Sequence, residues 1–185
     1  MLKANFITAQ EAAEKIQDGS TLCTIGMTLV SASESILKAI EKRFETVGHP
    51  ADITLVHSCG QSDRKDGIQH LAHEGLVKRI IGSHWGLQPR WMEMIANSQV
   101  EAYCLPQGQI AQLYRSMACG LPGKMSKVGL GTFIDPRVEG GKMNDRTKPL
   151  PDIVDILEYS GEEYMFYKEI PLDTCLLYTS DAADE

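Results

Sequence analysis

Residues 100–144 constrain the fold of this chain more than any other stretch. Residues 100–105 form a short β-branched and aromatic run that is closed by Pro106, which predicts a strand. From Gln107 onward, apolar side chains recur at helical spacing and predict a helix with one apolar face. These side chains belong to Ile110, Leu113 and Met117. The Pro-Gly pair at residues 122–123 ends this helix.

A second strand is predicted at residues 127–131, where Gly129 and Gly131 let a ligand approach the backbone closely. Ligands of parallel α/β sheets bind outside the carboxyl ends of the strands. Residues 106–108 and 129–132 are both expected at that edge of the sheet. Together they form one predicted wall of a binding site.

The first sixty residues show a similar alternation. Thr8 and Glu11 have the spacing of a capping box at the start of a helix. Residues 20–25 predict a buried strand, a loop beginning at Gly26 leads into a second helix, and residues 53–57 predict the next strand. Such a strand-helix-strand unit is nearly always parallel and right-handed.

The middle of the chain continues the pattern. Residues 58–67 form a polar loop that we expect to be exposed because of its charges. Residues 77–81 predict a third strand, and Pro89 suits the first turn of the helix that follows. Three side chains of this helix are expected to point inward: Trp91, Met92 and Ile95.

Two β-rich runs near the end, residues 153–159 and 162–170, flank Ser160 and Gly161 and predict a hairpin. The predicted fold class is α/β: an open, mostly parallel, Rossmann-like sheet with helices on both faces, plus this C-terminal β-hairpin. The order of the strands does not follow from the sequence.

Composition excludes some classes of function. The formal net charge of -7 argues against nucleic acid as the main partner, because phosphate binding needs a basic face. No apolar run approaches the roughly 20 residues of a membrane span. The N-terminus lacks the apolar core of a signal peptide, and five scattered cysteines fit reduced thiols. A cytoplasmic location is therefore predicted.

Two groups of reactive residues have plainer explanations. His70, His73 and Glu74 resemble a metal motif, but zinc protease helices place their histidines four apart with the Glu after the first. Polar or capping roles are therefore favoured, and no metal site is predicted. Cys59 lies near His57 in sequence, but no oriented base is visible, so a buried, inert thiol is favoured over a nucleophile.

Other residues are compatible with binding an anion or a carbonyl group. Gly26 lies at a strand-to-helix turn and offers backbone amides to an anion, although a phosphate loop normally carries more glycines. Gln107 can donate to a carbonyl or carboxylate oxygen, or simply be a solvated turn residue. Arg137 can bind a carboxylate or phosphate, although surface charge is favoured, and Trp85 fits packing better than a pocket. These residues alone indicate an α/β domain that binds a small anionic ligand.

Four motifs in combination carry a more specific signal: residues 71–79 (LAHEGLVKR), 82–86 (GSHWG), 105–108 (LPQG) and 129–137 (GLGTFIDPR). The combination resembles the N-terminal half of family I coenzyme A-transferases. The nearest type is the single-chain enzyme acting on acetate, propionate and other short acyl groups. The similarity runs from about residue 8 to residue 173.

The resemblance implies a transferase that moves coenzyme A between carboxylic acids, with CoA as a substrate and no tightly bound cofactor. In this family a glutamate attacks the acyl-CoA thioester to give a mixed anhydride. CoA thiolate then forms a glutamyl-CoA thioester, and an acceptor carboxylate completes the exchange. That glutamate lies in the C-terminal half of the family, so no catalytic residue is expected here. Four glutamates of this chain match no family motif: Glu139, Glu158, Glu162 and Glu163.

The same resemblance implies a set of substrate-binding residues. This set is Gly26, Met27, Gln107, Gly108, Gly131 and Thr132. Main-chain donors at Gly26, Gly108 and Gly131 are expected to border one hollow for the acyl end of a thioester. The chain departs from the family at residues 26–34 (GMTLVSASE), where the family carries Gly-Phe, further glycines and Pro-Glu. We expect the larger side chains there to change the acyl preference.

Residues 1–174 are expected to be the N-terminal CoA-transferase domain of a longer parent, inactive on its own. Residues 175–185 (CLLYTSDAADE) resemble a translated sequencing adapter and are expected to be a non-native, unpacked tail. The expected partners are acyl-CoA and carboxylate substrates, the missing C-terminal half, and further copies in a homo-oligomer. The alternatives are a non-catalytic small-anion or acyl-CoA sensor of similar fold, and a separate α subunit that needs a β partner.

Overall fold

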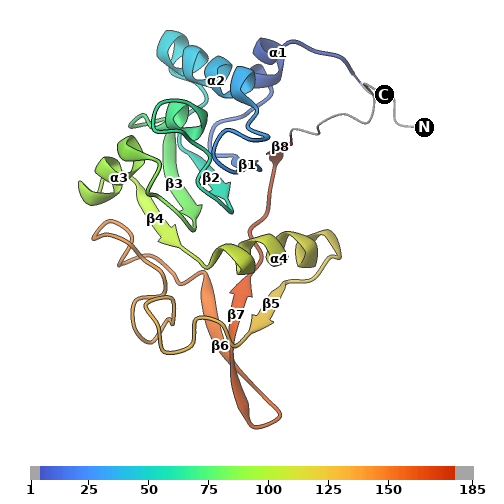
Figure 1. The fold of residues 1–185 in the computed structure, drawn as a ribbon, viewed down its shortest axis with the longest axis vertical. Helices are drawn as coiled ribbons and strands as arrows, with labels where there is room; N and C mark the ends of the chain where they lie inside the picture. Colours follow the sequence, from blue (N-terminus) through green and yellow to red (C-terminus); the bar gives the residue numbers. More distant parts are fainter. Residues whose placement is uncertain (1–4, 178–185) are drawn as a thin grey trace.

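The computed structural model describes residues 5–177 of the chain, which form two sheets and the helices packed around them (Figure 1). The larger sheet is parallel, with strand order β4-β3-β2-β1-β8. Its strands are β1 (Thr21–Thr24), β2 (Ile53–His57), β3 (Val77–Gly82), β4 (Glu101–Cys104) and β8 (Thr174–Leu176). The smaller sheet is antiparallel, with order β5-β7-β6. Its strands are β5 (Gly123–Ser126), β6 (Val154–Tyr159) and β7 (Glu162–Lys168).

Helices cover both faces of the parallel sheet, as predicted. They are α1 (Ala9–Glu14), α2 (Glu34–Val47), the 3-10 helix η1 (Gly67–Leu71), α3 (Pro89–Ala96) and α4 (Gln107–Ala118). The capping box at the start of α1 is confirmed, because the Glu11 amide donates to the Thr8 hydroxyl at 3.2 Å. Pro89 occupies the first turn of α3. Among the described residues, no helix is long and apolar enough to cross a bilayer.

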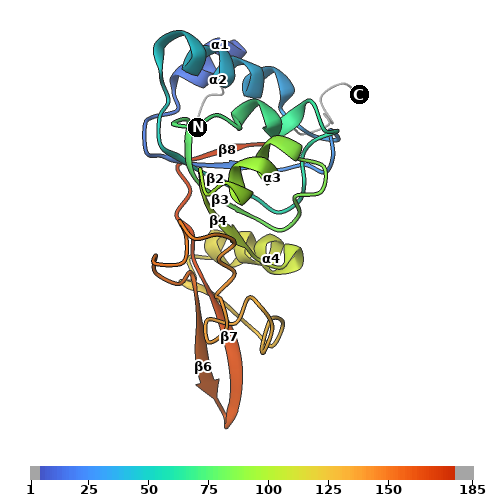
Figure 2. The same ribbon diagram turned by 90° about the vertical axis from the view of Figure 1, so that its left-hand side faces the viewer.

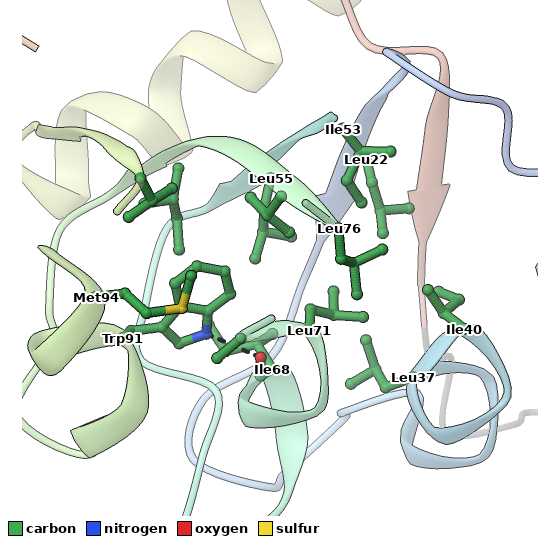
Figure 3. Close-up of a cluster of buried hydrophobic side chains, with 14 of the residues drawn as sticks. Leu22, Leu37, Ile40, Ile53, Leu55, Ile68, Leu71, Leu76, Trp91 and Met94 are labelled. Atoms are coloured by element: carbon green, nitrogen blue, oxygen red, sulfur yellow. Dashed lines mark hydrogen bonds between the residues drawn. The ribbon is translucent and has the colours of Figure 1, made fainter. Parts of the chain in front are cut away.

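Successive residues of the central strands pack into two different cores because side chains alternate between the faces of a sheet. Leu55 of β2 and Ile80 of β3 face α1, α2, η1 and α3, where Figure 3 shows the cluster around Trp91. Their neighbours Val56 and Ile81 face α4 and the small sheet. The nearly unbroken apolar runs of these strands therefore reflect burial on both sides.

The small sheet contains the predicted hairpin. Ser160 and Gly161 both have positive φ, 53° and 77°, as a two-residue turn with the twist of its strands requires. Residues 165–168 of β7 also pair with β5, which completes three strands. Figure 2 shows the β6–β7 hairpin projecting away from the parallel sheet.

The strand predicted at residues 127–131 is wrong. The strand ends at Ser126, and the next residues turn, with the Thr132 amide donating to the Gly129 carbonyl at 3.1 Å. Because β5 pairs antiparallel with β7, the loop at 129–132 does not follow a strand of the parallel sheet. The glycines of this segment make turns rather than a strand.

Three smaller predictions also fail. Met92 is 50% exposed, and Met94 takes the inward position on α3. The loop at 58–67 is only partly exposed, because Gln61 and Ser62 are buried. The tail was expected to be unpacked, but Cys175 pairs with β1 in strand β8 and Leu176 is buried in the core. The rest of the predicted tail, from residue 178, lies outside the described residues.

Candidate functional site

The carboxyl ends of the parallel strands bring four loops to one edge of the sheet. The loop after β1 joins the loop after β2, since the Thr28 amide donates to the Gly60 carbonyl at 2.9 Å. The loops after β2 and β3 are joined by the Ser83 hydroxyl, which donates to the Ser58 carbonyl. The segment after β4 joins β3 through the Leu105 amide and the Gly82 carbonyl, at 2.9 Å. This edge is the candidate functional site.

The loop after β1 holds its shape without the glycines of a phosphate cradle. Gly26 has φ of 152°, and a Cβ there would lie 2.8 Å from the Val30 carbonyl oxygen, so a side chain does not fit. The Met27 amide donates to the same carbonyl at 3.0 Å, which closes a tight turn. Met27 and Val30 are 59% and 67% exposed, and Leu29 is 38% exposed. The loop therefore presents an apolar surface at the edge.

The N-terminus of α4 presents hydrogen-bond donors at the other end of the same edge. Its N-cap residue is Pro106, and no side chain caps the helix. Within the described part of the chain, the amides of Gln107 and Gly108 have no hydrogen-bond partner. Both residues are exposed, and nothing lies within 4 Å of a Cβ built on Gly108. Free amides and the helix dipole together favour an anion or a developing oxyanion here.

Gly131 and Thr132 lie in the loop that follows β5, and their donors are already used. The Gly131 amide donates to Asp135 Oδ2 at 2.9 Å, and the Thr132 hydroxyl donates to the Gly129 carbonyl at 2.7 Å. The loop reaches the parallel sheet at its other end, where the Cys104 amide donates to the Gly141 carbonyl at 2.8 Å. The expectation that Gly131 supplies a free main-chain donor is therefore not met.

Asp135 and Arg137 fix the shape of that loop. The Asp135 carboxylate is 1% exposed and accepts from the Arg137 guanidinium, at 3.0 Å from Nε and 2.8 Å from Nη2. These side-chain bonds, with main-chain bonds from Gly131 and Arg137, outweigh burial and hold the pKa of Asp135 far below its ordinary value. The remaining guanidinium nitrogen, Nη1, donates to both oxygens of Glu163. Arg137 is thus paired with two carboxylates, and its side chain is 51% exposed, as the favoured prediction of a surface charge requires.

The two ends of the edge are too far apart to serve one atom. Strands β1 and β4 are separated by β2 and β3, so their ends are about 14 Å apart at about 4.8 Å per strand. Gly26 and Gly108 can therefore bind different parts of one elongated ligand, but not the same oxygen. The hypothesis of three amides around one hollow reduces to two donor positions on one edge.

His57 is a residue at this edge that the sequence did not single out for binding. Its ring is fully buried, and Nδ1 lies 2.8 Å from the Cys59 carbonyl, whereas Nε2 has no partner among the described residues. Burial lowers the pKa of His57 to about 4, so the ring is neutral near pH 7. The ring meets Trp85 edge-on, with centroids 5.1 Å apart, which gives Trp85 the predicted packing role. Cys59 is half-buried rather than buried, and the contact runs to its carbonyl and not to its thiol.

The histidines near residue 70 lie in a hydrogen-bonded network with α2. His70 contacts Glu34 and Glu41, and His73 Nε2 lies 2.8 Å from Glu41 Oε1. Ligand atoms of Glu34, Asp66 and His70 lie within 4.8 Å of one another, which is the spacing of a metal site. However, the Lys38 ammonium already contacts both carboxylates, at 3.0 and 3.4 Å, and competes with any other cation. The cluster thus fits an ionic network, as the polar alternative predicts.

Comparison with known proteins shows which family this chain resembles. Residues 6–182 match the model of the family described as Coenzyme A transferase. The chain is 42% identical over 183 residues to caffeate CoA-transferase of Acetobacterium woodii, covering 98% of this chain and 34% of that protein. It is 35% identical over 181 residues to the acetate CoA-transferase YdiF of Escherichia coli (strain K12), covering 97% of this chain and 34% of that protein.

Solved structures of a similar protein have the same fold. The crystal structure of the acyl-CoA transferase YdiF from Escherichia coli O157:H7 aligns as the apoenzyme with a TM-score of 0.87, and as a thioester complex with CoA with a TM-score of 0.84. Sequence identity in both alignments is 35%, over 91% of this chain and 33% of YdiF. The chain thus spans about a third of the length of the relatives it matches.

Proposed function

The chain belongs to the coenzyme A transferase family, and from this premise we propose that it is the N-terminal α/β part of an acyl-CoA:carboxylate CoA-transferase. The proposed substrates are CoA thioesters and carboxylates of the acetate, propionate and short-chain class. The catalytic glutamate lies in a part of the parent protein outside this chain. The relatives named above support this proposal because this chain spans only a third of their length.

The observation that carries the proposal is the uncapped N-terminus of α4. Gln107 and Gly108 place two unpaired amides at the carboxyl edge of the sheet, where ligands of such folds bind. Thioester exchange passes through oxyanions, and amides fixed in advance stabilise that charge without having to reorganise. The Gln107 side chain adds a neutral donor, which does not bind the ground-state carboxylates as tightly as a cation would.

In this proposal the chain binds and orients the substrate, while the rest of the parent supplies the nucleophile. The glutamate carboxylate attacks the thioester carbonyl carbon, the C–S bond breaks, and CoA leaves as a thiolate. The thiolate then attacks the glutamyl carbonyl of the resulting anhydride and releases the donor carboxylate, which leaves a glutamyl-CoA thioester for the acceptor carboxylate to attack. The amides at Gln107 and Gly108 bind the carbonyl oxygen as it becomes negative. Gly26, Gly131 and Thr132 shape the loops on either side.

The apolar loop after β1 is proposed to set the acyl preference. Its exposed side chains Met27, Leu29 and Val30 give an acyl group an apolar contact in place of the glycine-rich family loop. Larger or more apolar acyl groups gain from such a contact, because each buried methylene is worth about 0.8 kcal/mol. We propose a shift of preference away from acetate toward larger acyl groups.

The parent protein is proposed to be a cytoplasmic homo-oligomer that binds CoA as a substrate. The aligned YdiF structure, a thioester complex with CoA, supports CoA as the ligand of the parent. A non-catalytic sensor is the weaker alternative, because caffeate CoA-transferase and YdiF are both named as transferases. None of the observations above favours it.

The test is an exchange assay on the parent polypeptide recovered from its gene. Purified parent protein is incubated with acetyl-, propionyl- or butyryl-CoA and an unlabelled acceptor carboxylate, and new thioesters are measured by chromatography. We expect exchange by the parent and none by the 185-residue chain alone. A folded parent that binds acyl-CoA and transfers CoA to no carboxylate would overturn the proposal in favour of the sensor.

A further inference from the structure

His70 is held by carboxylates at both of its ring nitrogens. Nε2 lies 2.8 Å from Glu34 Oε1 and 3.3 Å from Asp66 Oδ1, and Nδ1 is hydrogen-bonded to Glu41 Oε2. The His70 side chain is only 13% exposed, and that of Glu41 is 19% exposed. Two carboxylates of α2 therefore hold one imidazole of η1 on its two sides.

Between two ionised carboxylates, this arrangement requires a charged ring. An ionised carboxylate only accepts hydrogen bonds, and a neutral imidazole has a single N–H. With a neutral ring, one nitrogen lone pair would face a carboxylate oxygen at hydrogen-bond distance. With both carboxylates ionised, both bonds form only when His70 carries two protons and is positive.

The proton on His70 offsets part of the negative charge that surrounds the ring. Burial of the ring opposes its charge, but the hydrogen bonds that Glu41 and Glu34 accept from the ring outweigh burial and raise the pKa of His70 above its ordinary value. The groups that face the network come from α2, from the segments before and after η1, and from α3. They are Glu34, Lys38, Glu41, Glu45, Asp66, His73 and Arg90. The carboxylates outnumber Lys38 and Arg90, so loss of the proton leaves excess negative charge at a half-buried position.

The network is connected to the candidate site by short steps. Glu34 is the first residue of α2 and follows directly after the loop at 26–33. Its second oxygen accepts the Gly67 amide at 2.9 Å, which ties the start of η1 to the start of α2. The loop before η1 is in turn bonded to the edge, through the Gly60 carbonyl to the Thr28 amide at 2.9 Å and from Gln61 Nε2 to the Thr24 carbonyl at 2.7 Å.

We propose that His70 is a pH-sensitive clamp: its imidazolium locks η1 to α2 and so holds the Gly26 loop, and its deprotonation releases that loop. The inference concerns the fold of this chain and does not depend on the transferase activity. A CoA-transferase containing the clamp would hold its acyl-binding loop more loosely as the pH rises through the pKa of His70.

The first experiment is an NMR titration of the histidine side chains of the 185-residue chain between pH 5.5 and pH 9. We expect His70 to titrate above the ordinary value of about 6.5. Amide hydrogen exchange is measured over the same range at Gly67, Ile68 and Thr28. Their protection factors should fall about tenfold as His70 loses its proton, whereas the buried Ala102 amide, bonded to Thr147, should keep its protection.

Two variants distinguish the effect of His70 from a general loss of amide protection at high pH. His70→Gln should give low protection at Gly67 that no longer depends on pH. His49→Gln is the matched control, because His49 forms an exposed pair with Asp18 away from the network, and it should leave the change intact. If His70→Gln does not fold, the titration and amide exchange of the unaltered chain still test the proposal. A His70 pKa at or below 6.5, a Glu41 carboxyl that titrates near neutral pH in its place, or constant protection while His70 titrates would each overturn the proposal.

Discussion

The ring of His57, at the end of β2, fills the space beside the α-carbon of Gly82, at the end of β3. A Cβ on Gly82 would overlap Nε2 of the ring and lie 3.1 Å from Cδ2. Both residues are buried. Position 82 thus requires glycine because the His57 ring, on the adjacent strand, occupies the space of a side chain. The backbone itself does not require glycine there, since the φ of Gly82 is not positive.

The first prediction concerns this contact. Gly82→Ala should lower the free energy of unfolding by about 2 kcal/mol, because the added methyl group overpacks a rigid site against a buried ring. Urea denaturation followed by circular dichroism measures the change. Gly108→Ala is the matched control, since nothing lies near its Cβ, and it should change stability by less than about 1 kcal/mol. Equal effects of the two substitutions would show that the His57 contact is not tight.

The second prediction is the pH dependence of stability that His57 imposes. Its pKa is about 4 in the folded chain and about 6.5 when unfolded, so below pH 6.5 the unfolded state binds a proton that the folded state rejects. The stability associated with the neutral ring is present above pH 6.5 and is lost as the pH falls toward 4. Between pH 7.5 and pH 5 the loss should be about 2 kcal/mol.

Urea denaturation across that pH range, on the unaltered chain and on His57→Asn, isolates this effect. His70 acts in the opposite direction, because its pKa is raised in the folded chain. The protonated ring stabilises the fold fully below pH 6.5, and that stability is lost as the pH rises through the pKa of His70 in the folded chain. Both proteins contain His70, so subtracting the free energy of unfolding of the variant from that of the unaltered chain at each pH removes the His70 contribution. Parallel curves for the two proteins would mean that His57 does not titrate as a buried neutral group.

The third prediction concerns the loop between β5 and β6. Asp135→Asn should destabilise the chain by about 2 kcal/mol, because a buried carboxylate with bonds from Arg137 and Gly131 loses its charge. The Gly131 amide should also exchange faster with solvent. Asp145→Asn is the control, since Asp145 forms an exposed pair with Lys148 and should have little effect. Unchanged exchange at Gly131 would remove the assigned role of Asp135.

The fourth prediction tests the donors of α4 in the parent enzyme. Gly108→Pro removes one amide from the first turn, where helices tolerate proline, and should lower kcat about a hundredfold. Gly108→Ala adds volume but keeps the amide, so its kcat should stay within about threefold of the unaltered enzyme. Steady-state exchange kinetics with propionyl-CoA measures both, with circular dichroism as a check on folding. Similar losses in both variants would indicate crowding rather than a lost donor.

Patterns within a single element were readable from the sequence. The spacing of Ile110 and Leu113 located α4, the pair Thr8 and Glu11 located α1, and Ser160-Gly161 located the hairpin turn. Each depends on residues within a few positions of one another. Residues 127–131 failed because a run with two glycines satisfies a strand pattern and a turn pattern equally well, and only pairing with β7 ended β5 at Ser126.

The candidate site was predictable only in part. The sequence located Gly26, Gln107 and Gly108 after strands, and parallel topology put them on one edge. It did not show that the Gly131 amide donates its hydrogen bond to Asp135, nor that two strands separate the strand before Gly26 from the strand before Gly108. His57 carried no local signal, because a histidine at the end of a strand is ordinary until its burial is known.

The sequence by itself determined the alternation of strands and helices and, through its motifs, the coenzyme A transferase family, because periodicity and short motifs are properties of neighbouring residues. Tertiary structure alone decided the order of the strands, which amides stay unpaired, and the two carboxylates that hold His70. Those features depend on residues such as Glu34 and His70, which lie 36 positions apart and meet only when α2 and η1 pack together.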